Sequence, residues 1–412
     1  FDVIRKYLEY KGFDVTYVSN YTDVDDKMIN RAREEDITVK ELALKIIPEV
    51  EKDYLALGIK KPDIQPRATE YVEAIVDLIK KLEAKGFTYL LDDGVYYDVS
   101  KFPEYGNFSG QTLSDLQAGA RVEVDERKKD PCDFALWKLK KEDDEPSWPS
   151  PWGDGRPGWH IECSAMTWKT LGEKFDIHGG GLDLKFPHHE CEVAQSLAAF
   201  GPGFFAQYWM HNGFIQINNE KMSKSLGNFF TLKEIFEKYD PRVVRFMFLQ
   251  THYRNPINFS DQLLEQAKSG LSRLHDFIRG LSSNSDGGKS IDAGNELVKF
   301  EEYMDNDFDT AGALGVLFEL VKVLNSLKAG GKLTKADVLE AEKFLKKVDS
   351  VLGIIYSEDN EIPNEIVKLA EERVIARRAK DFKKADQLRD EIKEKGYVVE
   401  DTASGFTLRN EL

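Results

Sequence analysis

Residues able to bind a metal ion gather in one short part of the chain. Four of the seven histidines fall between His160 and His189, and two of the three cysteines lie nearby. His188 and Glu192 are four residues apart, so they would project from one face of a helix, and Cys163 could come from a neighbouring strand or loop. Cysteine, histidine and glutamate are all zinc ligands, but structural zinc sites usually have four ligands. Taken alone, this common spacing favours a buried cysteine beside a crowded histidine turn over a metal site.

Two further segments contain residue types suited to phosphate groups. Residues 178–181 read His-Gly-Gly-Gly, and glycines let a backbone approach a ligand closely and expose its N–H groups. The same run occurs in esterase oxyanion holes, but that chemistry needs a Gly-x-Ser-x-Gly segment, which the chain lacks. Lys221 and Lys224 lie in a small, polar segment, where their ammonium groups could stabilise charge that develops on a phosphate chain. The alternatives are an ordinary tight turn and a solvated surface loop.

Helical and strand patterns at the start of the chain predict an α/β fold. An apolar helical spacing from Phe1 to Leu8 ends at Gly12, and a β-branched strand follows at 15–18. A helix that feeds such a strand indicates a βαβ unit with a parallel sheet. Residues 20–27 would then lie at the carboxyl end of the strand, where open α/β sheets bind their ligands.

The pattern changes twice along the rest of the chain. Helices are predicted at 39–56 and 67–85, and alternation around Asp93-Gly94 predicts a hairpin at 88–99. Residues 100–157 are rich in Gly, Pro, Trp and charge and have little helical period, which indicates an insertion between two halves of a sheet domain. From about residue 231 the pattern is helical almost to the end, where 396–412 predicts a short β appendage.

Composition and charge limit the class of protein. Hydrophobic residues make up 41% and charged residues 32%, as in soluble globular proteins. We find no apolar run of about 18 residues and no secretory signal, and three unpaired cysteines suit a reducing cytosol. The net charge of −16 argues against generic nucleic-acid binding, although a local basic face matters more than the sum. Such a face consists of Arg373, Arg377, Arg378, Lys380, Lys383 and Lys384, for which a solvated helix face is the simpler interpretation.

Several long motifs add information that spacing alone does not carry. Residues 221–225 read Lys-Met-Ser-Lys-Ser, and residues 20–27 read Asn-Tyr-Thr-Asp-Val-Asp-Asp-Lys. Further motifs lie at 105–125, 147–153, 158–166, 175–181, 186–190 and 376–386. Together they resemble the class I aminoacyl-tRNA synthetases, and within them the cysteine enzymes, over essentially the whole chain.

The resemblance implies an α/β fold with a Rossmann-like parallel-sheet catalytic domain, an inserted subdomain and a following α-helical bundle domain. The parts expected in chain order are the first part of the catalytic domain (1–99), the inserted connective subdomain (100–157), the second part of the catalytic domain with the zinc site (158–205), the Lys-Met-Ser-Lys-Ser and stem-contact region (206–265), the helical anticodon-stem-binding domain (266–395) and the small appendage (396–412).

The resemblance also implies a role for each candidate residue. One zinc ion would be bound by Cys163, His188 and Glu192 together with an upstream cysteine. L-cysteine would be surrounded by Thr22, Trp159 and His178. ATP with Mg²⁺ would contact Lys224, Lys221, Gly179, Gly180 and Asp183, of which the two lysines would be catalytic. tRNA(Cys) would bind the helical C-terminal part, including its basic residues. The resemblance further implies a cytoplasmic monomer without a membrane contact.

The chain departs from the family's pattern at its start. Class I synthetases carry a His-Ile-Gly-His motif just before the helix that begins here, and the sequence contains neither this motif nor the upstream cysteine. We therefore expect an N-terminally truncated enzyme. Two alternatives share the motifs, namely a cysteine ligase of mycothiol synthesis and a non-catalytic paralogue that binds cysteine or tRNA. The helical tail favours the tRNA enzyme over the ligase, and the missing motif is the one feature that favours the paralogue.

Overall fold

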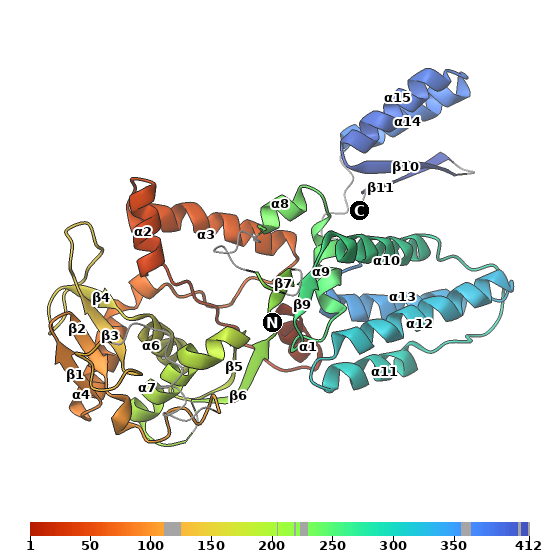
Figure 1. Ribbon diagram of the computed structural model, residues 1–412. Coiled ribbons are helices and arrows are strands. Elements are labelled where there is room, and N and C mark those ends of the chain that lie inside the picture. The colour runs from red at the N-terminus through yellow and green to blue at the C-terminus, as the bar shows by residue number, and fades with distance from the viewer. Residues whose placement is uncertain are drawn as a thin grey trace.

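The computed structural model describes residues 1–110, 125–203, 205–217, 220–222, 230–355, 364–402 and 405–410. Figure 1 shows an α/β part that contains α2 to α7, a bundle formed by α10 to α13, and a small unit of α14, α15, β10 and β11. Helix α1 and strands β7 and β9 lie between the α/β part and the bundle. The predicted α/β fold followed by helices is confirmed.

The first elements follow the sequence pattern closely. Helix α1 (Asp2–Tyr10), α2 (Asp26–Glu34) and α3 (Val39–Ala56) are all present. α3 begins with a capping box, in which Thr38 and Glu41 bond reciprocally and satisfy two free N–H groups. The helix expected at 67–85 is divided into η1 (Ala68–Glu70) and α4 (Val72–Ala84). The strand expected at 15–18 is wrong, because this segment forms only one isolated parallel bridge, at Val18 with Ile64. Tyr21, just beyond it, forms another with Arg67.

Four antiparallel strands form one sheet in the order β1-β2-β3-β4. The strands are β1 (Thr88–Leu91), β2 (Gly94–Tyr97), β3 (Phe134–Leu139) and β4 (Gly155–Pro157), and η2 (Val99–Lys101) follows β2. The predicted hairpin is confirmed, but Gly94 pairs with Leu91 as a strand residue. A Cβ atom at Gly94 would lie 2.1 Å from the Trp137 carbonyl oxygen, so glycine is needed there for the approach of β3. The sheet therefore begins at 88, twelve residues before the expected insertion.

A parallel strand pair carries the centre of the α/β part. β5 (Phe175–Gly181) pairs with β6 (Ala206–Asn212), with His178 opposite Trp209 and Gly180 opposite His211. The short η3 (Leu182–Leu184) and η4 (Lys185–His189) follow β5. Helices α6 (Trp159–Leu171) and α7 (Glu190–Phe200) share a buried core with α4 and the antiparallel sheet. This core fixes α6, which carries Cys163, and α7, which carries Glu192.

A second small sheet links the α/β part to the bundle. It consists of β7 (Ile215–Ile217), β8 (Glu220–Lys221) and β9 (Ile257–Phe259), in the order β8-β7-β9. Helices α8 (Leu232–Phe236) and α9 (Pro241–Leu249) lie between these strands in the chain. The backbone of Lys221 is part of β8, whereas Lys224 lies outside the described residues.

The bundle consists of α10 (Asp261–Arg279), α11 (Ala293–Asp305), α12 (Thr310–Ala329) and α13 (Lys335–Leu352). Its core also includes residues of α1 and α9. Within the described residues, α12 is the helix long and apolar enough to cross a membrane, with a mean hydropathy of 1.4. Its buried side chains, such as Leu317 and Leu324, pack inside the bundle core, so its length and apolar composition are weak evidence for a membrane span.

The end of the chain forms a separate unit. α14 (Asn364–Arg378) and α15 (Phe382–Glu394) pack against the antiparallel hairpin of β10 (Tyr397–Thr402) and β11 (Gly405–Asn410). Residues Ile366, Ala370, Ile392 and Val399 form a core distinct from that of the bundle. The predicted β appendage is present. The structure differs from the single helical domain expected at 266–395, because α14 and α15 bury their apolar faces on the hairpin.

Arg245 ties the α/β part to the bundle. Its side chain is 7% exposed, and Nη2 lies 2.6 Å from Asp2 Oδ2 in α1. Nε donates to the carbonyl oxygen of Leu352 at 2.6 Å, and Nη1 donates to that of Leu57 at 3.0 Å. A single guanidinium from α9 thus joins the ends of α1, α3 and α13.

We predict that Arg245→Met destabilises the protein by about 3 kcal/mol, because Asp2 keeps only Lys6 as an ion-pair partner and two backbone carbonyl groups lose charged hydrogen bonds. Thermal and urea unfolding would measure the loss. Arg254→Met is the matched control, since Arg254 is 54% exposed and pairs with Asp307 at the surface; it should cost at most about 1 kcal/mol. Equal stability of the two variants would contradict this role for Arg245.

Candidate metal and substrate site

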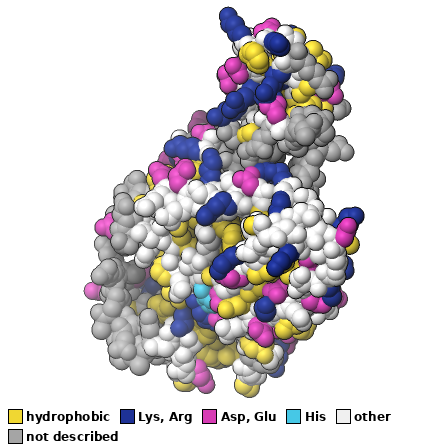
Figure 2. Space-filling view, turned by 90° about the vertical axis from the view of Figure 1, so that its right-hand side faces the viewer, with side chains coloured by type: hydrophobic (Ala, Val, Ile, Leu, Met, Phe, Trp, Pro, Cys, Tyr) yellow, Lys and Arg dark blue, Asp and Glu magenta, His cyan; other side chains and the backbone are white. Residues whose placement is uncertain are grey.

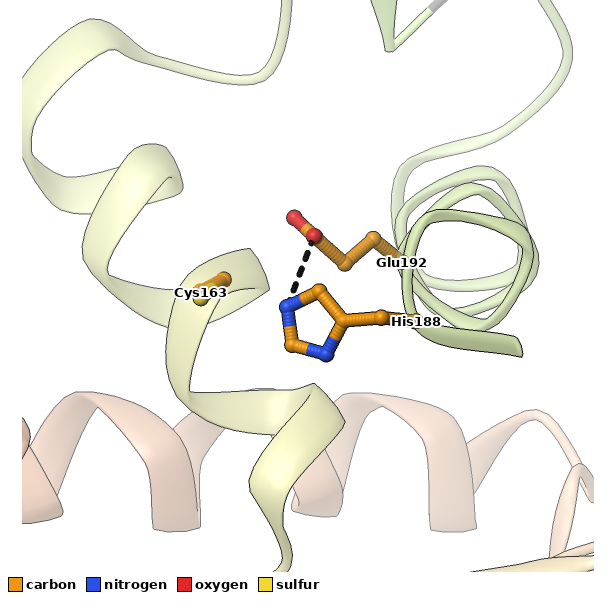
Figure 3. Close-up of side chains that lie close together, drawn as sticks. All are labelled: Cys163, His188 and Glu192. Atoms are coloured by element: carbon orange, nitrogen blue, oxygen red, sulfur yellow. Dashed lines mark ion pairs between the residues drawn. The ribbon is translucent and has the colours of Figure 1, made fainter. Parts of the chain in front are cut away.

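The structure brings the three predicted metal ligands together. Cys163 lies in the second turn of α6, His188 in η4 and Glu192 in the first turn of α7. Their ligand atoms all lie within 4.8 Å of one another. Figure 3 shows Cys163 on one helix facing His188 and Glu192 on the other. His188 and Glu192 therefore point to the same side, as their four-residue spacing predicts.

Glu192 has the surroundings of a carboxylate that needs a cation. It is fully buried, and neither carboxylate oxygen accepts a hydrogen bond from the described residues. Oε1 lies 3.2 Å from His188 Nε2 and 3.5 Å from His178 Nε2. A buried charge without a partner is costly, and sulfur, imidazole and carboxylate are the donor types that zinc prefers. The residues present therefore fit a zinc ion.

The thiol of Cys163 would have to lose its proton to bind a metal ion. Burial raises its pKa well above the ordinary value, and the negative charges of Glu192 and Glu162 raise it further. Without a cation the sulfur therefore stays protonated, whereas zinc binds the thiolate. Asn20 Nδ2 donates to Cys163 Sγ at 3.7 Å, so the Asn20 segment adjoins the candidate metal site.

Neighbouring histidines orient the candidate ligands. Nδ1 of His188 lies 2.9 Å from Nδ1 of His160, which leaves Nε2 of His188 directed at Glu192. Nδ1 of His189 lies 2.8 Å from Nε2 of His211. Such contacts to the second ring nitrogen orient metal-binding imidazoles. His178, His189 and Glu192 form a second group whose ligand atoms lie within 4.8 Å.

Burial keeps these flanking imidazoles neutral. It lowers the pKa of His160 and of His189 to about 3 in each case, against nearby Glu192, which acts in the opposite direction. A neutral ring offers one lone pair and one N–H. Sequence reasoning assigned no role to His160, His189 or His211, although the clustering of histidines was the signal that could have found the first two.

Two of the three residues expected to surround cysteine lie next to this group. Trp159 is the first residue of α6, is 45% exposed, and its ring centroid lies 4.4 Å from that of His188. His178 projects from β5, with its ring 4.7 Å from that of Trp209. Figure 2 shows a small patch of histidine among hydrophobic and charged side chains on the face that it draws. Because the Trp159 ring is partly exposed and lies against His188, the candidate site borders solvent at this ring.

The acidic segment around Thr22 is held in place by contacts of Tyr21, Asp23 and Asp25. Thr22 follows Tyr21, which bridges Arg67 in parallel. Asp23 is buried and accepts hydrogen bonds from the backbone N–H of Thr69 at 3.0 Å and from its hydroxyl at 2.6 Å. Asp25 caps α2 by accepting from Met28 N. These acids thus fix the Thr22 segment.

The structure describes only some of the candidate ATP residues. A Cβ atom at Gly179 would lie 2.4 Å from the ring of Phe1, and one at Gly180 would lie 2.9 Å from His189 Cε1. Glycine is therefore needed at both positions for close packing, while contact with ATP stays a prediction. Asp183 lies in η3. Of the two lysines, only the backbone of Lys221 is described, and Lys224 is not.

Comparison with known proteins now identifies the family. Residues 1–269 match the family described as tRNA synthetases class I (C) catalytic domain. Residues 299–356 match the DALR domain, and 359–409 match the cysteinyl-tRNA ligase anticodon binding domain. The chain belongs to the cysteinyl-tRNA synthetase family.

Relatives within this family match almost the whole chain. The cysteine–tRNA ligase of Caldicellulosiruptor saccharolyticus is 50% identical over 417 residues, which cover 98% of this chain and 89% of the relative. That of Geobacter sulfurreducens is 48% identical over 432 residues, covering 99% and 89%. Among solved structures, Mycobacterium tuberculosis methionyl-tRNA synthetase in complex with methionyl-adenylate has a TM-score of 0.59 at 16% identity and covers 86% of this chain and 84% of that one. This last likeness supports the class I fold.

The basic residues expected to contact tRNA fall into two groups. Arg373 is 6% exposed and binds Asp401 Oδ1 at 2.8 Å, and Arg377 also pairs with Asp401. These two contacts hold β10 against α14. Lys380, Lys383 and Lys384 are exposed, whereas the side chain of Arg378 is not described. The three lysines therefore remain the candidates for a contact with a phosphate backbone.

We predict that Cys163→Ser removes stoichiometric zinc from the purified protein, because an alcohol replaces the thiolate that zinc prefers. Elemental analysis by mass spectrometry measures the content directly. Cys132→Ser is the matched control, since Cys132 belongs to neither candidate group, and it should keep its zinc. A folded Cys163→Ser protein with full zinc content would rule out this ligand assignment.

Proposed function

We propose that this protein activates L-cysteine with ATP and transfers the cysteinyl group to the 3′ end of tRNA(Cys). The observation that carries the proposal is the match of 1–269 and 359–409 to the catalytic and anticodon binding domains of cysteine enzymes. The group of half-buried Cys163 with buried His188 and Glu192 supports it, because those residue types could distinguish a thiol substrate.

The need to distinguish cysteine from serine explains why a bound zinc ion would be useful. Cysteine and serine differ by one atom, and a pocket that relies on shape separates near-isosteres by only about 10²-fold. A zinc ion held by Cys163, His188 and Glu192 would prefer the soft thiolate over a hydroxyl group. The side chains of Trp159 and His178 would enclose the amino acid beside it. We therefore expect strong selection without an editing domain.

Adenylate formation would rest mainly on positioning and on charge stabilisation. Lys224, helped by Lys221, would neutralise charge on the α-phosphate and on the departing pyrophosphate, with Mg²⁺ carried by ATP. Gly179, Gly180 and Asp183 would contact ATP nearby. In the second step the terminal ribose of the tRNA would displace AMP. A cytoplasmic location and a monomeric state complete the proposal.

Two alternative activities are less well supported. A cysteine ligase of mycothiol synthesis would share the catalytic core but hand cysteine to an amino sugar, and the matched domain at 359–409 has no evident use in that reaction. A non-catalytic paralogue is favoured only by the lack of a His-Ile-Gly-His motif in the sequence. We propose the same division of the chain, except that the sheet from 88 belongs to the insertion and that α14 and α15 belong with the C-terminal hairpin.

The proposed activity predicts that the full-length gene product catalyses cysteine-dependent ATP–pyrophosphate exchange and cysteinylation of tRNA, with no comparable exchange on serine. Lys224→Ala should lower the exchange rate by about 10²–10³, as expected when a group that stabilises developing charge is removed. Lys335→Ala, an exposed lysine of the bundle, should leave the rate unchanged. Exchange without tRNA charging, but with transfer to an amino sugar, would favour the ligase. No exchange at all would favour the paralogue.

A second prediction concerns tRNA binding by the C-terminal unit. Changing Lys380, Lys383 and Lys384 together to Gln should weaken tRNA binding and reduce its dependence on salt, because fewer counterions are released from the phosphates. Filter binding at several salt concentrations measures both quantities, and the same change at Lys335 is the control. An unaltered salt dependence would place the tRNA contact elsewhere.

A further inference from the structure

The 102–110 loop is attached to the first residue of α7. Glu190 is fully buried, and its Oε1 accepts a hydrogen bond from the backbone N–H of Gly106 at 2.8 Å. Its Oε2 accepts one from the N–H of Ser109 at 2.7 Å. Gly106 has a φ of +98°, a conformation that favours glycine. Each oxygen of one carboxylate thus holds a different turn of the loop.

Two further contacts make the loop compact. The Ser109 hydroxyl donates to the carbonyl oxygen of Gly106 at 3.1 Å. The hydroxyl of Tyr105, which is 3% exposed, lies 3.4 Å from Cys191 Sγ, the next residue along α7. The loop is therefore fixed to the beginning of the helix that carries Glu192.

Phe108 lies between the two amides that Glu190 holds. Its ring centroid is 4.4 Å from that of Trp209 and 6.1 Å from that of His211. The ring of Trp209 in turn lies 4.7 Å from that of His178 and 5.2 Å from that of His189. A continuous series of contacts thus runs from the Glu190 carboxylate through Phe108 and Trp209 to His178.

Helix capping alone does not account for this arrangement. An acidic residue at a helix start interacts favourably with the helix dipole wherever its side chain points. The two oxygens of Glu190 instead meet amides that are 84 and 81 residues away in the chain. Charge-assisted bonds of this length are the strong kind, so the carboxylate specifies where the loop lies.

We propose that Glu190 is a positioning residue for the amino-acid site, which fixes the 102–110 loop so that Phe108 packs on Trp209 and holds Trp209 against His178. This role rests on the proposed function, because it assumes that His178 borders bound cysteine. It adds to that function a specificity element that comes from the inserted part of the chain. Neither Glu190 nor Phe108 touches the reacting atoms.

The test uses Glu190→Gln in the whole chain, since Gln keeps the size of the side chain but presents an N–H group to one loop amide. Hydrogen exchange of the 102–110 segment should rise about tenfold, as expected for the loss of a charged hydrogen bond. The KM for cysteine in pyrophosphate exchange should rise by about the same factor, while the KM for ATP and the zinc content stay unchanged. Glu104→Gln, an exposed position of the same loop, is the matched control and should change none of these.

Phe108 supplies a second and independent variant. Phe108→Ala should raise the KM for cysteine without changing the exchange of the Gly106 amide, and Phe108→Leu should restore most of the affinity. If the two residues act through one series of contacts, the Glu190→Gln/Phe108→Ala double variant should be no worse than the more impaired single variant. This readout holds even if Glu190→Gln lowers stability.

The outcomes separate this role from the proposed function. Faster exchange of the loop with an unchanged KM for cysteine in both single variants would make Glu190 a structural anchor only, and would overturn the positioning role. Additive effects in the double variant would also overturn it. A lack of cysteine-dependent exchange in the unchanged protein would overturn the proposed function, and the positioning role with it.

Discussion

The buried carboxylate of Glu192 is the constraint around which the α/β part is arranged. Neither oxygen receives a hydrogen bond from the described residues, so its charge must be met by a cation or by the imidazoles beside it. α6 brings a sulfur, η4 brings a ring nitrogen, and β5 brings His178. The packing of α6, η4 and α7 in one apolar core makes the approach possible. A polar site of this kind is stable only because the surrounding core is well packed.

The histidines near this carboxylate differ in their tasks. His188 presents one nitrogen to the metal-binding group, and His160 contacts the other. His189 of η4 contacts His211 of β6 and also fills the space beside Gly180. Burial favours the neutral form of these rings, which is the form that binds metals. One packed cluster can thus provide both ligands and the contacts that orient them.

Helix α1 connects this cluster to the bundle. At one end the ring of Phe1 packs on Gly179 of β5. At the other end Tyr7 donates to Asp305 Oδ1 at 2.6 Å, and Lys11 pairs with Glu301. The Arg245 guanidinium binds the first turn of the same helix. The segment from Phe1 to Lys11 therefore contacts both β5 and the bundle.

Local patterns in the sequence determined α1, α3, the β1–β2 hairpin and the four-residue spacing that puts His188 and Glu192 on one face. Long motifs determined the family, which periodicity could not. Tertiary structure alone decided that Cys163 lies close to those two residues and that Gly94 allows the close approach of β3. It decided as well that α14 and α15 pack on the β10–β11 hairpin and not in the bundle. It also decided that the basic Arg373 is an internal partner of Asp401. The reason is physical: spacing along the chain fixes which side chains share a face, but only packing between distant segments brings faces together and buries their charges.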